Sequence, residues 1–101
     1  MDVNYDNSEK QLMFKLTEEI DHHTTESIRR RADYEIQRHI PKKVIFDFSS
    51  VSFMDSAGIG MIIGRYKLLG MLGGTLELTN VSPSVEKILQ MSGIMKIINI
   101  K

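Results

Sequence analysis

The spacing of apolar residues changes repeatedly along this chain between every second and every fourth position, and this change constrains the fold more than any other feature. Apolar and polar residues alternate over 12–16, which predicts a half-buried strand. Apolar residues recur at every fourth position over 28–40, which predicts a helix that Pro41 ends. The apolar run 44–48 predicts a strand buried on both faces, in which Asp47 indicates either the strand's end or a carboxylate bonded to a loop.

The second half of the chain repeats this alternation. Helical spacing over 57–69 is followed by an alternating strand over 75–79. The Ser-Pro pair at 82–83 is typical of a helix start, and Gly93 is typical of a left-handed C-terminal cap. Residues 97–100 are expected to form a last strand.

Strands that alternate with helices usually lie parallel and are joined by right-handed crossovers. The chain is therefore expected to form a small α/β domain with a mixed, mostly parallel sheet and alternating helices. The extreme N-terminal segment is expected to add an antiparallel strand. The pattern leaves open whether the helices cover one face of the sheet or both.

Length and composition limit the classes of function. A chain of 101 residues, 42% of them hydrophobic and 26% charged, is expected to form a single domain over 1–101. The formal net charge of zero gives no electrostatic reason to expect nucleic acid or an anionic membrane as the main partner. The absence of cysteine excludes disulfides, thiol catalysis and thiolate metal sites. The acidic N-terminus and short apolar runs predict a cytoplasmic protein without signal peptide or membrane span.

Three consecutive arginines, at 29–31, lie on the polar side of the helix predicted over 28–40. Each has a carboxylate four positions away, in the pairs Glu26–Arg30, Arg29–Asp33 and Arg31–Glu35. We therefore expect a solvated, self-paired helix face rather than a phosphate or nucleic-acid site.

Histidines and methionines are weaker candidates for function. His22 and His23 are adjacent and cannot face one side of a helix, so loop histidines or a partner contact are expected rather than a metal site. His39 is expected to be structural, at a helix C-terminus. Met54 is expected to contact a partner, whereas core filling is expected for three other methionines: Met61, Met71 and Met91.

The segment 51–60 follows a buried strand and precedes a helix, which is where α/β proteins build sites. Ser56 is expected at or beside the helix N-cap, with its hydroxyl facing outward near unpaired backbone N–H groups. Such a helix end tolerates a phosphate, which would add about −1.5 to −2 charge beside Asp55. A plain helix cap explains the same residues, and the local sequence alone favours the cap.

Three glycines, Gly58, Gly60 and Gly64, lie in the helix predicted after this segment. Each costs roughly 0.5–1 kcal/mol relative to alanine. Such a cost usually accompanies the close approach of another backbone, either the protein's own sheet, which is slightly favoured, or a partner's. The spacing of these glycines is not that of a dinucleotide-binding fingerprint.

Several stretches together resemble the anti-sigma factor antagonists of spore-forming bacteria, a family with the STAS (sulfate transporter and anti-sigma factor antagonist) domain. They are Leu-Thr-Glu-Glu-Ile-Asp-His-His-Thr at 16–24, Phe-Asp-Phe at 46–48, Val-Ser-Phe-Met-Asp-Ser-Ala-Gly-Ile-Gly at 51–60, Gly-Arg-Tyr-Lys at 64–67 and Met-Ser-Gly-Ile-Met-Lys-Ile-Ile at 91–98. The resemblance covers nearly the whole chain. The Asp-Ser-Ala-Gly tetrad alone is moderately specific, and its combination with Asp-His-His and Gly-Arg-Tyr-Lys is highly specific.

The resemblance implies a STAS fold and a regulatory binding protein, not an enzyme, with no cofactor or metal of its own. Ser56 matches the family's phosphorylated serine. The implied partner is an anti-sigma factor that is itself a serine kinase with bound nucleotide. The unphosphorylated protein binds this kinase and releases a sporulation sigma factor, phosphorylation ends binding, and a serine phosphatase restores it. The residues implied to bind the partner are Asp21, Asp55, Ser56, Ala57, Gly58, Ile59, Gly60, Met61 and Arg65, and those from Gly58 to Arg65 are implied to form one helix face beside Ser56.

Two features depart from the family's pattern, and three alternatives stay open. Ala57 stands where serine is about as common, and the sequence ends at Lys101, where family members usually continue into another helix. Either the domain lacks that helix and exposes part of its sheet, or the sequence is truncated. One alternative is a STAS domain of another partner-switching pathway. Another is a small serine hydrolase, for which the sequence lacks the nucleophile-elbow glycine. The third is a small-ligand or nucleotide-binding module that holds a phosphate at the turn before Ser56, for which the sequence lacks a suitably placed lysine.

Overall fold

The computed structural model describes residues 1–101 as a five-stranded sheet with helices. The elements are β1 (Asp2–Asp6), β2 (Gln11–Lys15), α1 (Thr25–His39), β3 (Lys43–Asp47), α2 (Ser56–Leu72), β4 (Thr75–Thr79), α3 (Pro83–Ser92), the 3₁₀ helix η1 (Ile94–Lys96) and β5 (Asn99–Ile100). The strands lie in sequence order across the sheet. β1 pairs antiparallel with β2, and all other pairs are parallel, as predicted.

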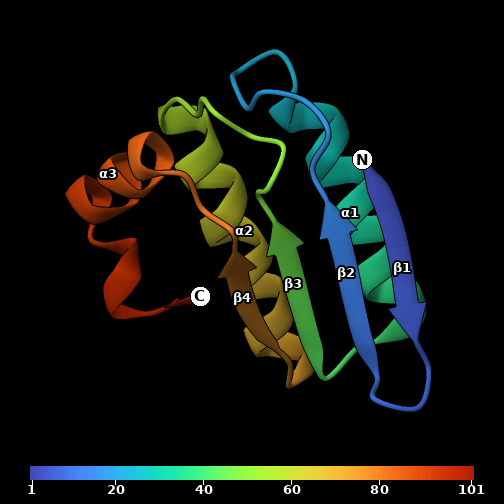
Figure 1. The fold of residues 1–101 in the computed structure, drawn as a ribbon. Helices are drawn as coiled ribbons and strands as arrows, with labels where there is room; N and C mark the ends of the chain where they lie inside the picture. The colour runs from blue at the N-terminus through green and yellow to red at the C-terminus, as the bar shows by residue number, and fades with distance from the viewer.

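Helices α1 and α2 lie side by side on one face of the sheet, and α3 lies beside α2 (Figure 1). The strand order explains this arrangement. When parallel strands follow one another across a sheet, right-handed crossovers place every connecting helix on the same face. The helices therefore cover one face of the sheet, which the sequence had left open. Both long helices begin at the sheet edge where the parallel strands end (Figure 1).

The hydrophobic core lies between this face of the sheet and the helices. Apolar strand side chains that are no more than 5% exposed come from alternate positions: Leu12, Phe14, Val44, Phe46, Leu76 and Leu78. The helices contribute Ile28, Ala32, Ile36, Ile62, Leu69, Val85 and Leu89. The rings of Phe14 and Phe46 stack with centroids 5.3 Å apart, across the register of β2 and β3. This core fixes the positions of the loops that follow β2 and β3.

The opposite face of the sheet carries polar side chains around one buried isoleucine. Ile45 is only 7% exposed, and it lies in register between Met13 and Glu77. Nζ of Lys43 and Nζ of Lys101 lie 3.3 Å and 3.2 Å from Oε1 of Glu77. Burial acts to raise the pKa of Glu77, but hydrogen bonds to the two lysines outweigh it and the pKa falls below its ordinary value. The prediction that β3 is buried on both faces is confirmed.

Local signals placed the ends of the helices correctly. Oγ of Ser82 accepts a hydrogen bond from the N–H of Val85 at 3.3 Å, and Gly93 ends α3 with a φ of +79°. Helix α1 ends at His39, and its C-cap Ile40 takes a left-handed conformation before Pro41. Ile40 is 48% exposed, so its assignment to the buried stripe of α1 was wrong.

Two further predictions about elements need correction. The last strand was expected over 97–100, but β5 has only two residues, because the N–H groups of Ile97 and Ile98 bond back to the carbonyl oxygen of Ile94 and continue the turn of η1. The pair Arg31–Glu35 does not form. A guanidinium nitrogen of Arg31 instead donates to the carbonyl oxygen of Met1 at 2.6 Å, and Arg38 lies 3.6 Å from Glu35.

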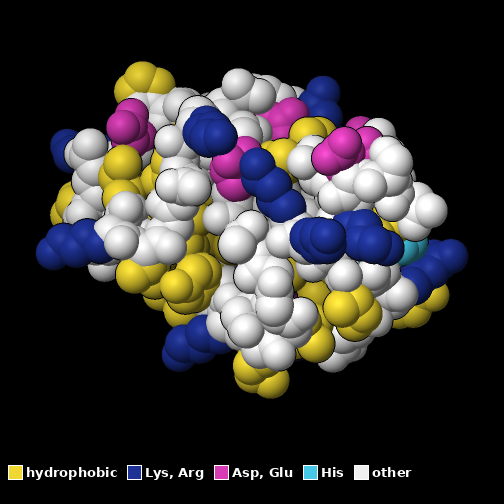
Figure 2. Space-filling view, turned by 90° about the horizontal axis from the view of Figure 1, so that it is seen from below, with side chains coloured by type: hydrophobic (Ala, Val, Ile, Leu, Met, Phe, Trp, Pro, Cys, Tyr) yellow, Lys and Arg dark blue, Asp and Glu magenta, His cyan; other side chains and the backbone are white.

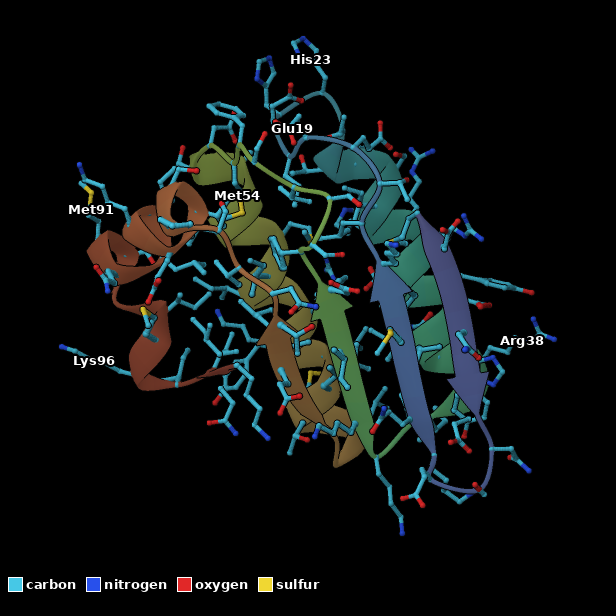
Figure 3. All side chains as sticks on the ribbon, in the orientation of Figure 1. Glu19, His23, Arg38, Met54, Met91 and Lys96 are labelled. Carbon is cyan, nitrogen blue, oxygen red and sulfur yellow. The ribbon has the colours of Figure 1, made fainter.

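Methionines divide between core and surface. Met61 is buried as predicted, but Met71 and Met91 are 81% and 80% exposed, so core filling was wrong for both. Met54 is fully buried, and the prediction that it contacts a partner was therefore wrong. Its side chain points inward under the start of α2, whereas Met91 projects outward from α3 (Figure 3).

Two polar residues outside the site have the structural roles that the sequence predicted. Oδ1 of Asp47 accepts hydrogen bonds from the side chain of Asn80 at 3.1 Å and from the N–H of Ser49 at 2.9 Å, so this carboxylate is bonded to loops. The ring of His39 stacks on the ring of Tyr5 with centroids 4.0 Å apart.

The end of the molecule seen from below carries cations and carboxylates side by side, interspersed with apolar side chains (Figure 2). This mixture agrees with the formal net charge of zero. No helix of this structure combines the length and the apolar character that crossing a membrane requires.

Candidate functional site

Two loops at the carboxyl ends of β2 and β3 are joined by backbone contacts. The N–H of Ile20 donates to the carbonyl oxygen of Phe53 at 3.1 Å, and the N–H of Asp55 donates to that of Ile20 at 3.0 Å. These bonds form an isolated parallel bridge between Ile20 and Met54, whose side chains are both fully buried. The bridge extends the pairing of β2 with β3 into the loops and holds residues 21 and 55 close together.

Side chains tie the same loops together at the surface. Glu19 accepts hydrogen bonds from the N–H of Ser52 at 2.9 Å and from its hydroxyl at 2.6 Å. The hydroxyl bond in particular lowers the pKa of Glu19 below its ordinary value. The hydroxyl of Ser84, in the first turn of α3, donates to the carbonyl oxygen of Ser52 at 2.8 Å. Three segments distant in sequence thus meet at one end of the molecule.

Asp55 caps α2, and Ser56 is the first residue of that helix. Oδ1 of Asp55 accepts a hydrogen bond from the N–H of Ala57 at 2.9 Å. Oδ2 accepts one from the N–H of His22 at 3.3 Å. Ser56 is exposed, and its hydroxyl forms no hydrogen bond within the protein. The predicted position of Ser56 beside the cap is confirmed, and the cap itself is Asp55.

Asp21 organises the turn that leads into α1. Its Oδ1 accepts hydrogen bonds from the N–H groups of His23 at 2.8 Å and Thr24 at 3.1 Å. The bond from His23 contributes most to lowering the pKa of Asp21 below its ordinary value. The rings of His22 and His23 lie 3.9 Å apart and are exposed, as expected for loop histidines (Figure 3).

The helix residues implied to form one face beside Ser56 point in different directions, so that expectation was wrong. Gly58 and Met61 are buried, and Gly58 lies against Met54 and Ile20. Arg65 is 7% exposed and faces α1. Ile59 and Gly60 line different grooves, one toward α3 and the other toward α1. Four consecutive residues span more than one turn of a helix, which is why they cannot share a face.

Two grooves flank the N-terminus of α2. One, of about 310 Å³, lies between α2 and α3 and is mostly apolar, with Ser56 at its edge and Ile59, Ile88 and Met91 along it. The other, of about 150 Å³, lies between α2 and α1 beside Ala57 and Gly60. The largest cavity, about 420 Å³, lies elsewhere, at the sheet edge between α2 and η1.

The contribution of α3 to this site was missed by the sequence analysis. Ile88 fits the buried stripe of α3 by its spacing, and Met91 has no local feature that distinguishes it from a core methionine. Only the docking of α3 against α2 brings both residues next to Ser56.

The arrangement holds no catalytic constellation. The ring of His22 faces the carboxylate of Asp55, with Nδ1 3.9 Å from Oδ2, and no imidazole bonds to the hydroxyl of Ser56. The geometry offers an exposed serine at a helix start, between the loop carboxylates of Asp21 and Asp55 on one side and an apolar groove on the other. Such a surface is suited to protein binding that a charge on the serine can change.

Comparison with known proteins gives the class. The family model of the STAS domain matches residues 2–101. The chain is 40% identical to an anti-sigma F factor antagonist of Paenibacillus polymyxa, over 88% of this chain and 76% of that protein. It is 35% identical to one of Lysinibacillus sphaericus, over 82% of this chain and 71% of that protein.

Solved structures agree with this match. The structure of the anti-sigma factor antagonist SpoIIAA in its unphosphorylated form is similar with a TM-score of 0.85 and 31% identity, over 99% of this chain and 86% of that one. The structure of the Bacillus cell fate determinant SpoIIAA in the phosphorylated form is similar with a TM-score of 0.75 and 30% identity, over 99% of this chain and 89% of that one. The chain belongs to the STAS domain family, in its branch of anti-sigma factor antagonists. Proteins of this branch are regulatory binding proteins and not enzymes, so the alternative of a serine hydrolase is wrong.

Proposed function

We propose that this protein is a cytoplasmic anti-sigma F factor antagonist whose binding is switched by a phosphate on Ser56. The unphosphorylated protein binds an anti-sigma factor that is also a serine kinase with bound nucleotide, and this binding releases a sporulation sigma factor. The kinase phosphorylates Ser56 and ends the interaction. A serine phosphatase removes the phosphate and restores it.

The position of Ser56 carries this proposal. A kinase needs a hydroxyl that it can reach, and Ser56 is exposed and free of hydrogen bonds to the rest of the protein. Because Asp55 already caps α2, the helix does not need the Ser56 hydroxyl. A phosphate at the first residue of a helix also lies near the positive end of the helix dipole, so the fold tolerates it.

The proposed partner surface extends from Ser56 in two directions. In one direction lie Asp21 and Asp55, whose carboxylates accept hydrogen bonds in the loops before α1 and α2. In the other lies Ile59, which lines the apolar groove toward α3. Ala57 and Gly60 lie toward α1. Two buried members of the expected set, Gly58 and Met61, support this surface from within, and the largely buried Arg65 lines the groove toward α1.

Phosphorylation acts on this surface without refolding the domain. The phosphate adds about −1.5 to −2 charge, next to the carboxylate of Asp55. A partner that covers the groove along Ile59 and Ile88 would have to strip water from that charge against apolar side chains. The cost of desolvation and the repulsion from Asp55 both weaken binding.

Phosphorylation by the cognate kinase tests the proposed site. The protein is incubated with kinase and ATP, and the modified residue is found by mass spectrometry. Ser56→Ala should abolish incorporation. Ser84→Ala is the matched control, because Ser84 is also an exposed serine in the first turn of a helix, and this variant should be phosphorylated like the wild type. Incorporation that survives in Ser56→Ala would refute the assignment.

Binding to the unphosphorylated partner tests the electrostatic account. Ser56→Asp adds a negative charge, and Ser56→Asn adds a side chain of nearly the same shape without one. Ser56→Asp should weaken binding by roughly tenfold more than Ser56→Asn does. Equal dissociation constants for the two variants would show that shape, not charge, governs the switch.

A further inference from the structure

The groove between α1 and α2 lies one residue away from Ser56 and has a different chemistry from the apolar groove. It opens between the first turns of two parallel helices that begin at the same sheet edge (Figure 1). Its α1 side is formed by Thr25, Glu26 and Arg29, and its α2 side by Ala57, Gly60, Met61 and Arg65. Its volume of about 150 Å³ is below the range of typical small-molecule pockets, and it suits a single side chain.

Gly60 keeps this groove open without an internal need for glycine. A Cβ atom on Gly58 would collide with Met54, but a Cβ atom on Gly60 would meet nothing within 4 Å. Glycine weakens a helix relative to alanine, so Gly60 costs stability for which the domain itself offers no packing reason. The missing side chain leaves room for another molecule to approach the helix backbone.

Arg65 supplies a guanidinium at the same groove that is paired with a carboxylate but incompletely hydrogen-bonded within the protein. The guanidinium is buried, with a side-chain exposure of 8%. Its Nε lies 2.7 Å from Oδ1 of Asp33, but the two atoms are not aligned as a hydrogen bond. Its one hydrogen bond within the protein runs from a terminal nitrogen to the carbonyl oxygen of Met61 at 3.2 Å. Since a guanidinium carries five N–H donors, most of them have no protein acceptor.

The charged residues that line the groove are one carboxylate, Glu26, and two guanidinium groups, Arg29 and Arg65. Glu26 lies 2.7 Å from Arg29 and 3.0 Å from Arg30. Asp33 lies 2.7 Å from Arg65 and 3.8 Å from Arg29. Two guanidinium groups and one carboxylate thus line the groove, while Asp33 and Arg30 contact them from outside its lining. The lining itself favours a further carboxylate, and guanidinium groups bind carboxylates with two parallel hydrogen bonds.

We propose that this groove receives a carboxylate side chain, an Asp or Glu, of the anti-sigma factor that docks over Ser56. This inference rests on the proposed function, because continuity with Ser56 through Ala57 is what places a partner over the groove. The carboxylate lies against Gly60, faces Arg29 at the rim and accepts hydrogen bonds from Arg65 at the back. The partner therefore contacts α2 on both sides of Ser56, through apolar groups toward α3 and through a charge toward α1.

A pair of glycine variants tests whether the groove is occupied. Gly60→Ala places a methyl group in the groove, and Gly70→Ala makes the same change in the same helix where a Cβ also meets nothing within 4 Å. Both variants should fold and melt at or above the temperature of the wild type. Gly60→Ala should bind the anti-sigma factor at least about tenfold more weakly, whereas Gly70→Ala should bind like the wild type. Equal affinities for the two variants would overturn the inference.

A pair of arginine variants tests the charge of the occupant. Arg29→Gln removes a guanidinium that lines the groove, and Arg30→Gln removes its neighbour, which pairs with the same Glu26 but does not line the groove. Arg29→Gln should weaken binding roughly fivefold or more and reduce the salt dependence of the dissociation constant, and Arg30→Gln should do neither. If the wild type binds and the two arginine variants behave alike, the inference that a carboxylate occupies the groove is wrong. If the wild type itself does not bind the anti-sigma factor, the proposed function fails instead.

Discussion

Met54 lies directly under Gly58, so that a Cβ atom on Gly58 would come within 2.5 Å of the Met54 sulfur. Both residues are buried, and Ile20 closes the space on the other side at 3.0 Å. Gly58→Ala should therefore lower the free energy of unfolding by about 1–2 kcal/mol, because overpacking outweighs the gain in helix propensity. Urea denaturation measures this change. Gly70→Ala, in open space, should raise the free energy of unfolding by about 0.5–1 kcal/mol, and a stabilised Gly58→Ala would contradict the packing.

The glycines of α2 show how far the sequence could be interpreted. Its analysis recognised that glycines within a helix need a reason, and it favoured the protein's own sheet slightly over a partner. The structure gives Gly58 an internal reason, in the buried loop contacts of Met54 and Ile20, but gives none to Gly60 or Gly64. No local pattern could separate these cases, because the difference depends on which side of α2 meets the loops.

The order of elements and the position of Ser56 were predictable, because they depend on local signals such as alternation, the Ser-Pro helix start and the glycine cap. The directions in which residues 58–61 point from α2 were not predictable. Helix α2 carries apolar residues or glycine around most of its circumference near its start, so no stripe indicates which side packs. The role of α3 was equally hidden, since Met91 reaches Ser56 only through tertiary packing.

The Asp55 cap predicts a measurable contribution to stability. Asp55→Ala removes the acceptor for the N–H groups of Ala57 and His22 and should cost about 1–2 kcal/mol. Asp55→Asn keeps an oxygen for the cap and should recover most of that loss. Thermal or chemical denaturation of the three proteins checks this order. Equal stability of Asp55→Ala and the wild type would show that the cap does not hold the start of α2.

The bond between Glu19 and Ser52 predicts that stability falls in acid. The folded state lowers the pKa of Glu19 below its ordinary value of 4.5, chiefly through the Ser52 hydroxyl, so the unfolded state binds its proton more tightly. The stabilisation is present above pH 4.5 and is lost as the pH falls through the folded pKa.

Glu19→Gln should therefore destabilise the protein at neutral pH and lose less stability than the wild type on acidification. Glu18→Gln is the matched control, because Glu18 forms no such bond to the neighbouring loop. Denaturation curves at neutral pH and near pH 3 measure both effects. Parallel pH profiles of Glu19→Gln and the wild type would remove Glu19 as a source of this dependence.

The contact between Arg65 and Asp33 predicts strong coupling between α1 and α2. Asp33→Ala leaves the buried guanidinium without its carboxylate and should cost up to about 3 kcal/mol, less than for a fully buried pair because Asp33 is 25% exposed. Replacing both residues by apolar ones, Asp33→Leu with Arg65→Met, should restore much of the stability. A double-mutant cycle measures the coupling, and additive losses would show that the two charges act independently.

The exposed methionines allow a test of the groove between α2 and α3. Met91 and Met71 are almost equally exposed, but only Met91 lines the groove beside Ser56. Met91→Asp should weaken binding of the anti-sigma factor by at least about tenfold, because it places a charge where an apolar contact is expected. Met71→Asp should leave binding unchanged, and neither variant should lower the melting temperature by more than a few degrees. Calorimetric titration gives both affinities. An equal loss in the two variants would indicate a general effect of added negative charge and would remove α3 from the proposed partner surface.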